Sequence, residues 1–178
     1  MIIKNFNYKC VNSTNDTAIN LIKKNNLKAG LVIAKSQKKG RGQRGKKWIS
    51  YKGNLFVSIF FSLEKINLSL EQLTKKNVKL IIKLLSRYYK KKINIKMPND
   101  ILINKKKICG ILQETIQKKN IKYLIVGIGL NLIKSPNISS YPTTNLYDLT
   151  QKKIGTYKII RELKYIYKIF LKSQKVFE

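Results

Sequence analysis

The alternation of apolar and polar positions predicts two strands in the first part of the chain. Residues 4–11 place Phe6, Tyr8 and Cys10 on one side, and a short apolar run follows at 31–34. Successive side chains of a strand point to opposite faces, so a two-residue period indicates a strand. We therefore expect one strand at 4–11 and a second at 31–34.

The segment 54–63 differs from these because both of its alternating sets are largely apolar. The sets are Leu55, Val57, Ile59 and Phe61 on one side and Phe56, Ser58, Phe60 and Ser62 on the other. A strand that is apolar on both faces is typical of the middle of a sheet. Further strands are predicted at 93–95, 101–103, 108–117 and 121–132, with turns at 97–100, 104–105 and 118–120.

Helical spacing appears in three places. Ser13-Thr14-Asn15-Asp16 precedes the apolar residues of a first helix, where a hydroxyl or amide side chain caps the first turn. A second helix is predicted at 69–90 and a last one at 157–174, with a loop at 134–145 before it. The apolar stripe of the second helix consists of Leu70, Leu73, Val78, Ile81, Ile82, Leu85 and Tyr88.

Strands interrupted by two or three helices indicate one layered domain over residues 1–178. We expect an α/β (α+β) fold, with a mixed, largely antiparallel central sheet flanked by helices. A chain of 178 residues suits one domain, and its 43% hydrophobic content is enough for a core.

Composition narrows the function classes. No apolar run approaches the ~20 residues that cross a bilayer, and no signal peptide is expected. The chain has no histidine, and its two cysteines, Cys10 and Cys109, lie far apart. These counts exclude a zinc site and a histidine-based catalytic triad. A reducing, cytoplasmic setting fits the cysteine usage best.

The net charge of +30 would ordinarily indicate nucleic acid binding. Here the charge is mostly lysine spread along the whole chain, and lysine, asparagine and isoleucine are all abundant. We interpret this as coding bias displayed on solvated surfaces, with non-specific adhesion to nucleic acid at low salt. We therefore expect no specific nucleic acid partner and no membrane partner.

Residues 40–48 carry the strongest functional signal, Gly40-Arg41-Gly42-Gln43-Arg44-Gly45-Lys46-Lys47-Trp48. Glycines let the backbone approach a ligand, and arginines present forked donors to phosphate or carboxylate. The loop favours an anionic ligand, although such loops also bind RNA or stay disordered. The eight acidic residues are informative because they are scarce, and Asp16, Asp100 and Glu114 fall in the segments of interest. We expect an acid near the site to have a role there.

Three further segments accompany this loop. Residues 13–15 form either an ordinary helix cap or part of a site. Residues 96–100 and 107–114 form either a turn and hairpin with solvated lysines or a binding segment. On one face of the predicted strand at 121–132, Gly127 and Gly129 leave room for a flat ligand or for a tightly packed helix.

Together and in this order, the four segments resemble the catalytic domain of biotin–protein ligase, also called biotin–acetyl-CoA-carboxylase ligase. The resemblance runs from residue 8 to 150 and includes a stretch at 141–146. It implies ATP-dependent ligation of biotin to a lysine of the biotin carboxyl carrier protein of acetyl-CoA carboxylase, with ATP and Mg²⁺ as cofactors. The implied reaction passes through biotinyl-5′-AMP and needs no enzyme nucleophile, because catalysis comes from aligning two anions among cations.

The resemblance also implies roles for individual residues, with Lys107 and Arg41 as the catalytic pair. The implied biotin-binding residues are Ser13, Thr14, Asn15, Gln37, Gly40, Arg41, Gly42, Gln43, Trp48, Lys107, Gly110, Gly127 and Gly129. The implied nucleotide-binding residues are Arg41, Arg44, Lys46, Asn99, Lys107 and Asn131, and Asp100 is implied as a Mg²⁺ ligand. Hydroxyl and amide groups suit the ureido head of biotin, flat apolar walls suit its rings, and cations suit its carboxylate.

The sequence departs from the family pattern at several positions. Gln43 stands where many members have arginine, which removes one charge beside the adenylate. Met97 replaces a tryptophan and Cys109 a residue of alanine size, and neither change removes a group that the reaction needs. The glycine loop is expected to be mobile until ligand binds. We expect neither an N-terminal DNA-binding domain nor the C-terminal β-barrel of most members, and the chain as either a monomer or a homodimer.

Three other interpretations compete with this one. A lipoate ligase or octanoyltransferase of the same fold resembles the architecture, but relies on a motif with histidine, which this chain lacks. A basic RNA-binding protein would interleave aromatic residues with basic clusters on one face, whereas the Tyr and Phe residues here lie mainly in predicted strands and helix stripes. A degenerate, inactive relative is the third.

Overall fold

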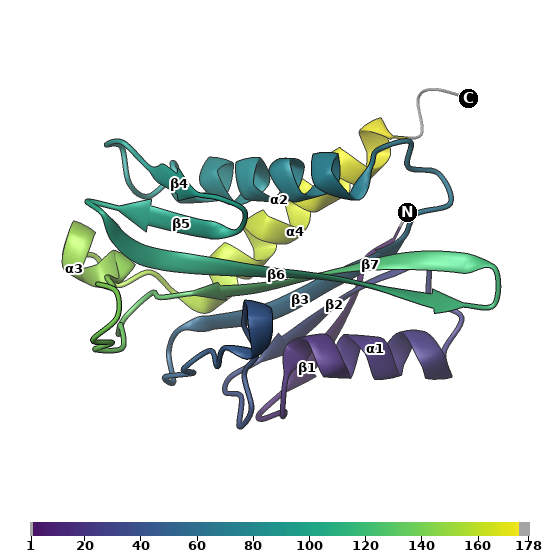
Figure 1. Ribbon diagram of the computed structural model, residues 1–178, viewed down its shortest axis with the longest axis horizontal. Helices are drawn as coiled ribbons and strands as arrows, with labels where there is room; N and C mark the ends of the chain where they lie inside the picture. Colours follow the sequence, from purple (N-terminus) through teal and green to yellow (C-terminus); the bar gives the residue numbers. More distant parts are fainter. Residues whose placement is uncertain (1, 175–178) are drawn as a thin grey trace.

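A seven-stranded sheet runs through the molecule with helices on both of its faces (Figure 1). The computed structural model describes residues 2–174. The strands are β1 (Lys4–Tyr8), β2 (Ala29–Ala34), β3 (Leu55–Ser62), β4 (Asn94–Lys96), β5 (Asp100–Ile103), β6 (Lys106–Lys118) and β7 (Ile121–Leu130). Their order is β1-β2-β3-β7-β6-β5-β4; β1 and β2 pair in parallel, and the other neighbours pair antiparallel. This confirms the predicted mixed, largely antiparallel sheet.

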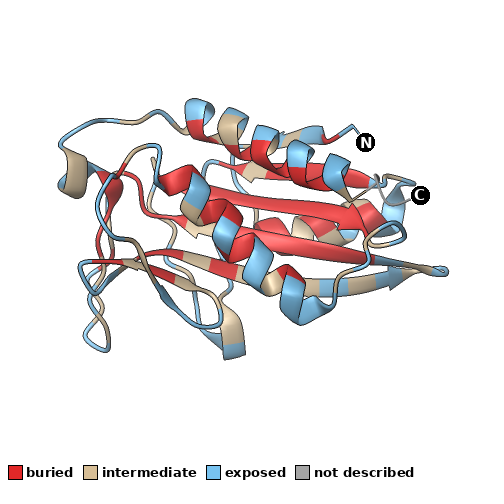
Figure 2. Ribbon diagram, turned by 90° about the horizontal axis from the view of Figure 1, so that it is seen from above, coloured by how far each residue is buried: buried red, intermediate tan, exposed pale blue. Residues whose placement is uncertain are grey.

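Helices cover the two faces unequally. The helices are α1 (Thr14–Lys24), α2 (Leu70–Leu85), α3 (Leu146–Thr150) and α4 (Thr156–Ser173), and a short 3-10 turn, η1, spans Gln43–Gly45. Helices α2 and α4 lie together on one face of the sheet, while α1 and η1 lie on the other (Figure 1). Buried positions run along the central strands and along the sheet-facing sides of α2 and α4 (Figure 2).

Strand β7 shows how the two faces differ. Leu124 and Val126 point into the large apolar core that α2 and α4 cover, whereas Tyr123 and Ile125 pack in a smaller cluster with α1. Alternation then places Gly127 and Gly129 on the α1 face as well. The α1 face is therefore filled at one end of β7 and free of strand side chains at the other.

Strand β3 lies inside the sheet between β2 and β7, and all eight of its residues are buried, as predicted. The capped first helix is also confirmed, because the Ser13 side chain accepts a hydrogen bond from the Asp16 N–H. The hairpin turn predicted at 104–105 is confirmed: it joins β5 to β6, with positive φ angles at both residues.

Several boundaries differ from the sequence predictions. The first strand ends at Tyr8, and the second helix ends at Leu85 rather than 90. Leu70, which was placed in the apolar stripe, is the first residue of α2 and is 40% exposed. Helix α3 was not predicted; it begins beyond the expected loop, where the Asn145 side chain accepts from the Asp148 N–H.

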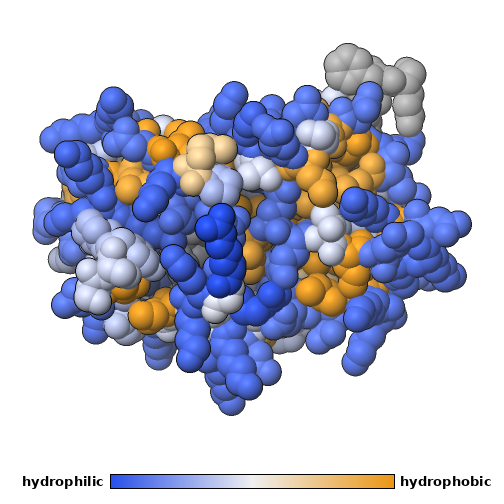
Figure 3. Space-filling model, in the orientation of Figure 1, coloured by the Kyte–Doolittle hydropathy of each residue, from blue (hydrophilic) through white to orange (hydrophobic). Residues whose placement is uncertain are grey.

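The face seen in Figure 3 is mostly hydrophilic, with apolar patches between the polar side chains. This agrees with the interpretation of the lysines as solvated surface residues. Within residues 2–174, none of the helices combines the length and apolar character required to cross a bilayer.

Candidate active site

The floor of the candidate site is a glycine-lined patch on β6 and β7. Gly110 of β6 pairs directly with Gly129 of β7. A Cβ atom on Gly129 would lie 2.3 Å from a ring carbon of Trp48, and one on Gly110 would lie 2.7 Å from another. The two glycines therefore admit the indole ring, which lies against the strands because nothing larger than hydrogen separates them.

Gly127 makes room in the same way for the start of α1. A Cβ atom there would lie 2.3 Å from Asn15 Oδ1. The patches expected to be bare on the Gly127 and Gly129 face are thus covered by the protein's own Asn15 and Trp48. At Gly127 the alternative of tight packing against a helix is the one that the structure bears out.

A chain of polar groups runs along this wall of the site. Gln37 Oε1 accepts from both the Thr14 N–H at 2.8 Å and the Thr14 hydroxyl at 3.1 Å, and Gln37 Nε2 donates to Ser50 Oγ at 3.1 Å. The buried Ser58 hydroxyl lies 2.8 Å from Thr14 Oγ1 and 2.5 Å from Asn15 Oδ1. These contacts fix the side chains at the mouth of α1 before any ligand arrives.

Lys107 reaches the α1 face through an irregularity in β6. Gly110 and Glu114 lie on that face, so simple alternation would place Lys107 on the opposite one. The β5–β6 pairing shifts register at this point and leaves Ile108 as an extra residue of β6. Ile108 is buried in the core, while Lys107 lines the site. A bulge re-aims a side chain in just such a manner.

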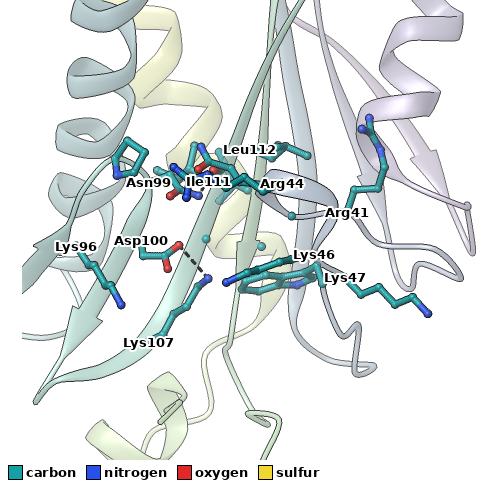
Figure 4. A pocket seen from close by; sticks show the side chains of 18 of the residues that line it. Arg41, Arg44, Lys46, Lys47, Lys96, Asn99, Asp100, Lys107, Ile111 and Leu112 are labelled. Carbon is teal, nitrogen blue, oxygen red and sulfur yellow. Dashed lines mark hydrogen bonds and ion pairs between the residues drawn. The ribbon is translucent and has the colours of Figure 1, made fainter. Parts of the chain in front are cut away.

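The Lys107 ammonium has three close neighbours. Nζ lies 2.9 Å from Asp100 Oδ1 (Figure 4). It also lies 5.5 Å from the centre of the Trp48 ring and 5.3 Å from that of Tyr141. The loop after β7 also holds its backbone, because the Lys107 N–H donates to the Pro142 carbonyl at 2.9 Å. Cation–π contacts and an ion pair together hold this ammonium in place.

Arg41 is held at the other side of the site, next to α1 (Figure 4). Nη1 and Nη2 donate to the two carboxylate oxygens of Glu114 at 2.9 and 2.7 Å, and Nη2 lies 2.7 Å from Asp16 Oδ1. The hydrogen bonds to Glu114 raise the pKa of the Arg41 guanidinium above its usual value. The scarce acids near the site, Asp16, Glu114 and Asp100, each form an ion pair with Arg41 or Lys107.

The basic loop is folded in this structure. The Gly42 N–H donates to the Lys46 carbonyl at 2.6 Å and the Trp48 N–H to the Gly40 carbonyl at 2.9 Å, which closes a small hairpin around η1. Its tip needs positive φ angles, 53° at Arg44 and 73° at Gly45. Mobility of this loop before ligand binding stays a prediction.

One cavity of about 350 Å³ collects the predicted residues. Its lining includes Ser13, Thr14, Asn15, Gln37, Arg41, Gly42, Gln43, Arg44, Lys46, Trp48, Asn99, Asp100, Lys107, Gly110, Gly127 and Gly129. Gly40 is buried and does not line the cavity. The cavity has the size typical of small-molecule sites, and it joins all four sequence segments.

Asn131 lies outside this cavity. It lines a second, much smaller hollow of about 10 Å³ that shares Trp48, Lys107 and Tyr141 with the first. Its amide donates to the Thr144 carbonyl at 3.1 Å, so the side chain supports the loop after β7. A nucleotide role for Asn131 stays a prediction.

Three contributors to the site were not predicted as site residues. Ser58 was assigned only to the predicted strand at 54–63, and its small polar side chain within an apolar segment was a usable signal. Glu114 was noted only as a scarce acid. Asn54 is buried, and its Oδ1 accepts from the N–H groups of residues 132, 133 and 134, which shapes the chain after β7.

The remaining charges of the cavity are uncompensated cations. Arg44, Lys46, Lys47, Lys96 and Lys105 line it, and none of them has an ion pair within the described residues. No group of three or more His, Cys, Asp or Glu side chains that could hold a metal occurs within residues 2–174. The cavity therefore favours a ligand that carries several negative charges.

A mixed sheet with a glycine floor, a polar wall and a ring of cations defines a pocket for an anionic small molecule. Residues 8–131 match the Biotin/lipoate A/B protein ligase family, and the chain belongs to this family.

Two relatives and one solved structure illustrate the match. The chain is 33% identical over 129 residues to the bifunctional ligase/repressor BirA of Bacillus subtilis. These aligned residues make up 71% of this chain and 40% of that protein. It is 31% identical over 115 residues to the biotin–[acetyl-CoA-carboxylase] ligase of Paracoccus denitrificans, 60% of this chain and 45% of that protein. The matches therefore span less than half of these relatives.

The structure of biotin protein ligase from Aquifex aeolicus in complex with biotin and ATP is similar over nearly the whole chain. The TM-score is 0.82 at 27% identity, and the match covers 99% of this chain and 74% of the other. The likeness extends beyond the residues of the family match to both ends of the described fold.

Proposed function

We propose that this protein ligates biotin to a lysine of a biotin carboxyl carrier protein, using ATP and passing through biotinyl-5′-AMP. The observation that carries the proposal is the convergence of four separate segments on one cavity, with Lys107 at one side and Arg41 at the other. Family membership and the similarity to a ligase solved with biotin and ATP support it. The lack of histidine and the burial of Cys109 fit a reaction that uses no enzyme nucleophile, and the two free cysteines fit a cytoplasmic setting.

In the proposed first step, a biotin carboxylate oxygen attacks the α-phosphorus of ATP and pyrophosphate leaves. The two reactants are both anionic, so they approach only if cations offset their repulsion. The Lys107 ammonium would lie between the carboxylate and the α-phosphate and offset this repulsion. To do so, it would exchange its ion pair with Asp100 for contacts with oxygens of the two ligands. Arg44 and Lys46, which are unpaired within the described residues, would attract the phosphates.

Biotin would lie along the polar wall and against the Trp48 ring, which covers the glycine floor. The mouth of α1 and Gln37 offer hydroxyl and amide groups for the ureido head, with Ser13 and Thr14 foremost. The Trp48 ring offers a flat apolar wall for the bicyclic rings. We place the base of the nucleotide toward Asn131, and this requires the small hollow beside Trp48 to open.

Mg²⁺ would enter with ATP rather than as a resident metal. Magnesium usually keeps several waters and is bound through phosphates and one or two carboxylates. Asp100 could supply one such carboxylate arm, and its ion pair with Lys107 would have to loosen for it to do so.

In the proposed second step, the amine of the acceptor lysine attacks the acyl carbon of the mixed anhydride, and AMP leaves. No enzyme group becomes covalently attached. Cys109 is buried, and burial raises the pKa of its thiol, so it stays protonated and takes no part.

Transfer to a carrier domain tests this function. Incubation with ATP, labelled biotin and an apo biotin carboxyl carrier domain should label one lysine, and omission of ATP should abolish the label. Parallel reactions with labelled octanoate and lipoate should give none. Preferential transfer of octanoate or lipoate would replace the proposal with the lipoate branch of the same family.

A further inference from the structure

Arg41 is the most firmly held cation of the cavity, and the acids that hold it have no part in the proposed chemistry. We propose that Glu114, assisted by Asp16, is a positioning residue that fixes the Arg41 guanidinium at the cavity edge. The inference rests on the proposed function, because the purpose of the arrangement is to present Arg41 to the reacting anions.

The donor count of Arg41 leaves capacity for a ligand. A guanidinium has five N–H groups. Two of them form the paired bonds to Glu114, at 2.9 and 2.7 Å, and a third points to Asp16 at 2.7 Å. One N–H on Nη1 and the Nε–H are left over. Because the paired bonds fix the plane of the guanidinium, they also fix the direction of these two remaining donors.

Glu114 is itself fixed to the wall of the cavity. Its Oε2 also accepts from Asn15 Nδ2 at 2.6 Å. Asn15 cannot shift freely, since its amide N–H also donates to the Leu112 carbonyl at 3.3 Å and its oxygen accepts from Ser58 Oγ at 2.5 Å. Glu114 thus joins Arg41 of the basic loop to the polar wall on which we place the ureido head.

The local charges favour orientation over attraction as the role of this cluster. Arg41 faces two carboxylates, Asp16 and Glu114, so the three side chains together carry a formal negative charge. Such a cluster does not draw anions into the cavity. We assign the attraction of anions to cations that have no ion pair among residues 2–174, such as Arg44 and Lys46. Arg41 is then left to act on a ligand that is already bound.

A double-mutant cycle on Arg41 and Glu114 tests the proposal, with adenylate formation as the readout. Glu114→Gln keeps the shape and an oxygen for Asn15 but removes the charge. We expect a loss in kcat on the order of 10- to 100-fold, the scale of a misplaced catalytic group, with little change in KM for ATP. The double variant should be no slower than Arg41→Ala alone.

If the fold-loss in kcat of the double variant equals the product of the two single-variant losses, the proposal is overturned. Glu114 would then act independently of Arg41. A rise in KM for ATP as large as the fall in kcat would overturn it too, since general disruption would explain both. Glu64→Gln is the matched control: this glutamate pairs with Lys28 and does not line the cavity. It should behave as the unmodified chain.

A second readout needs neither biotin nor ATP. Trypsin cleavage after Arg44 and Lys46 should be several-fold faster in Glu114→Gln than in the unmodified chain and in Glu64→Gln, with circular dichroism unchanged. Equal cleavage rates in the two proteins would contradict the claim that Glu114 restrains the basic loop through Arg41. Absence of any adenylate from the unmodified chain would instead remove the proposed function, and faster cleavage would still establish that Glu114 holds Arg41.

Discussion

The two faces of strand β7 are built on opposite plans. Toward α2 and α4, Leu124 and Val126 are fully buried in the apolar core. Toward α1, Gly127 and Gly129 carry no side chains, and Asn15 and Trp48 fill the space instead. The packed core face makes the strand rigid, while the glycines of the site face let Asn15 and Trp48 lie close to its backbone. A floor without side chains keeps its shape because its other face is packed.

The same contrast extends to β6, where alternate residues face either the core or the cavity. Cys109 and Ile111 belong to the core face, whereas Gly110 and Glu114 belong to the site face. The extra residue at Ile108 brings Lys107 onto the site face. A substitution on one face should therefore leave the packing of the other face intact.

The largest effect is expected at Lys107. Lys107→Ala should slow biotinyl-adenylate formation by a factor on the order of 10² to 10³, because a preorganised cation is removed from developing charge. Lys106→Ala is the matched control, since Lys106 is exposed and does not line the cavity. Single-turnover assays with labelled ATP measure both. Equal losses in the two variants would mean that β6 does not aim Lys107 as described.

A core-face change should act on stability alone. Leu124→Ala removes a fully buried side chain and should lower the free energy of unfolding by about 2–5 kcal/mol. Urea denaturation measures this loss. The biotin affinity of the folded protein should stay within about twofold of the original, because effects at distant, independent sites are additive. A large loss of affinity would show that the two faces are coupled.

A site-face change should act on both stability and binding. A methyl group on Gly129 meets the Trp48 ring, so Gly129→Ala should cost about 1–3 kcal/mol and displace the indole. Trp48 is the only tryptophan, and its fluorescence should shift and lose its response to biotin. Gly155→Ala is the control, because a Cβ there meets nothing within 4 Å. An unchanged Gly129→Ala spectrum would contradict the described packing.

The smallest effect concerns the two cysteines. Cys109 is buried on the core face, and the desolvation that raises the pKa of its thiol leaves less thiolate at any given pH. Iodoacetamide at pH 8 should therefore modify exposed Cys10 in the folded protein and reach Cys109 only after denaturation. Peptide mass spectrometry identifies the modified site. Labelling of Cys109 in the folded protein would place it outside the core.

The sequence predicted the elements that depend on hydrophobic periodicity. Strand β3, with apolar residues on both faces, lies inside the sheet, and Ser13 caps α1. Helix α3 was missed because five residues are too short for a periodic pattern. The second helix was extended too far because Tyr88 continues the apolar spacing beyond the last helical residue.

The site was predictable where residue identity carries the chemistry, as at Lys107 and the glycines of β7. Its tertiary pairings were not. The contact of Glu114 with Arg41 joins residues 73 positions apart, and no local pattern encodes it. The register shift beside Ile108 was equally hidden, because sequence alternation alone places Lys107 on the wrong face.

The central claim is that a single cavity holds the carboxylate of biotin against the α-phosphate of ATP. A crystal structure of the protein with biotin and a non-hydrolysable ATP analogue tests it most directly. We expect a carboxylate oxygen about 3–3.5 Å from the α-phosphorus, with Lys107 Nζ contacting both groups. Biotin bound away from Trp48 and the polar wall at Thr14 and Gln37, or Lys107 contacting neither ligand, would contradict it.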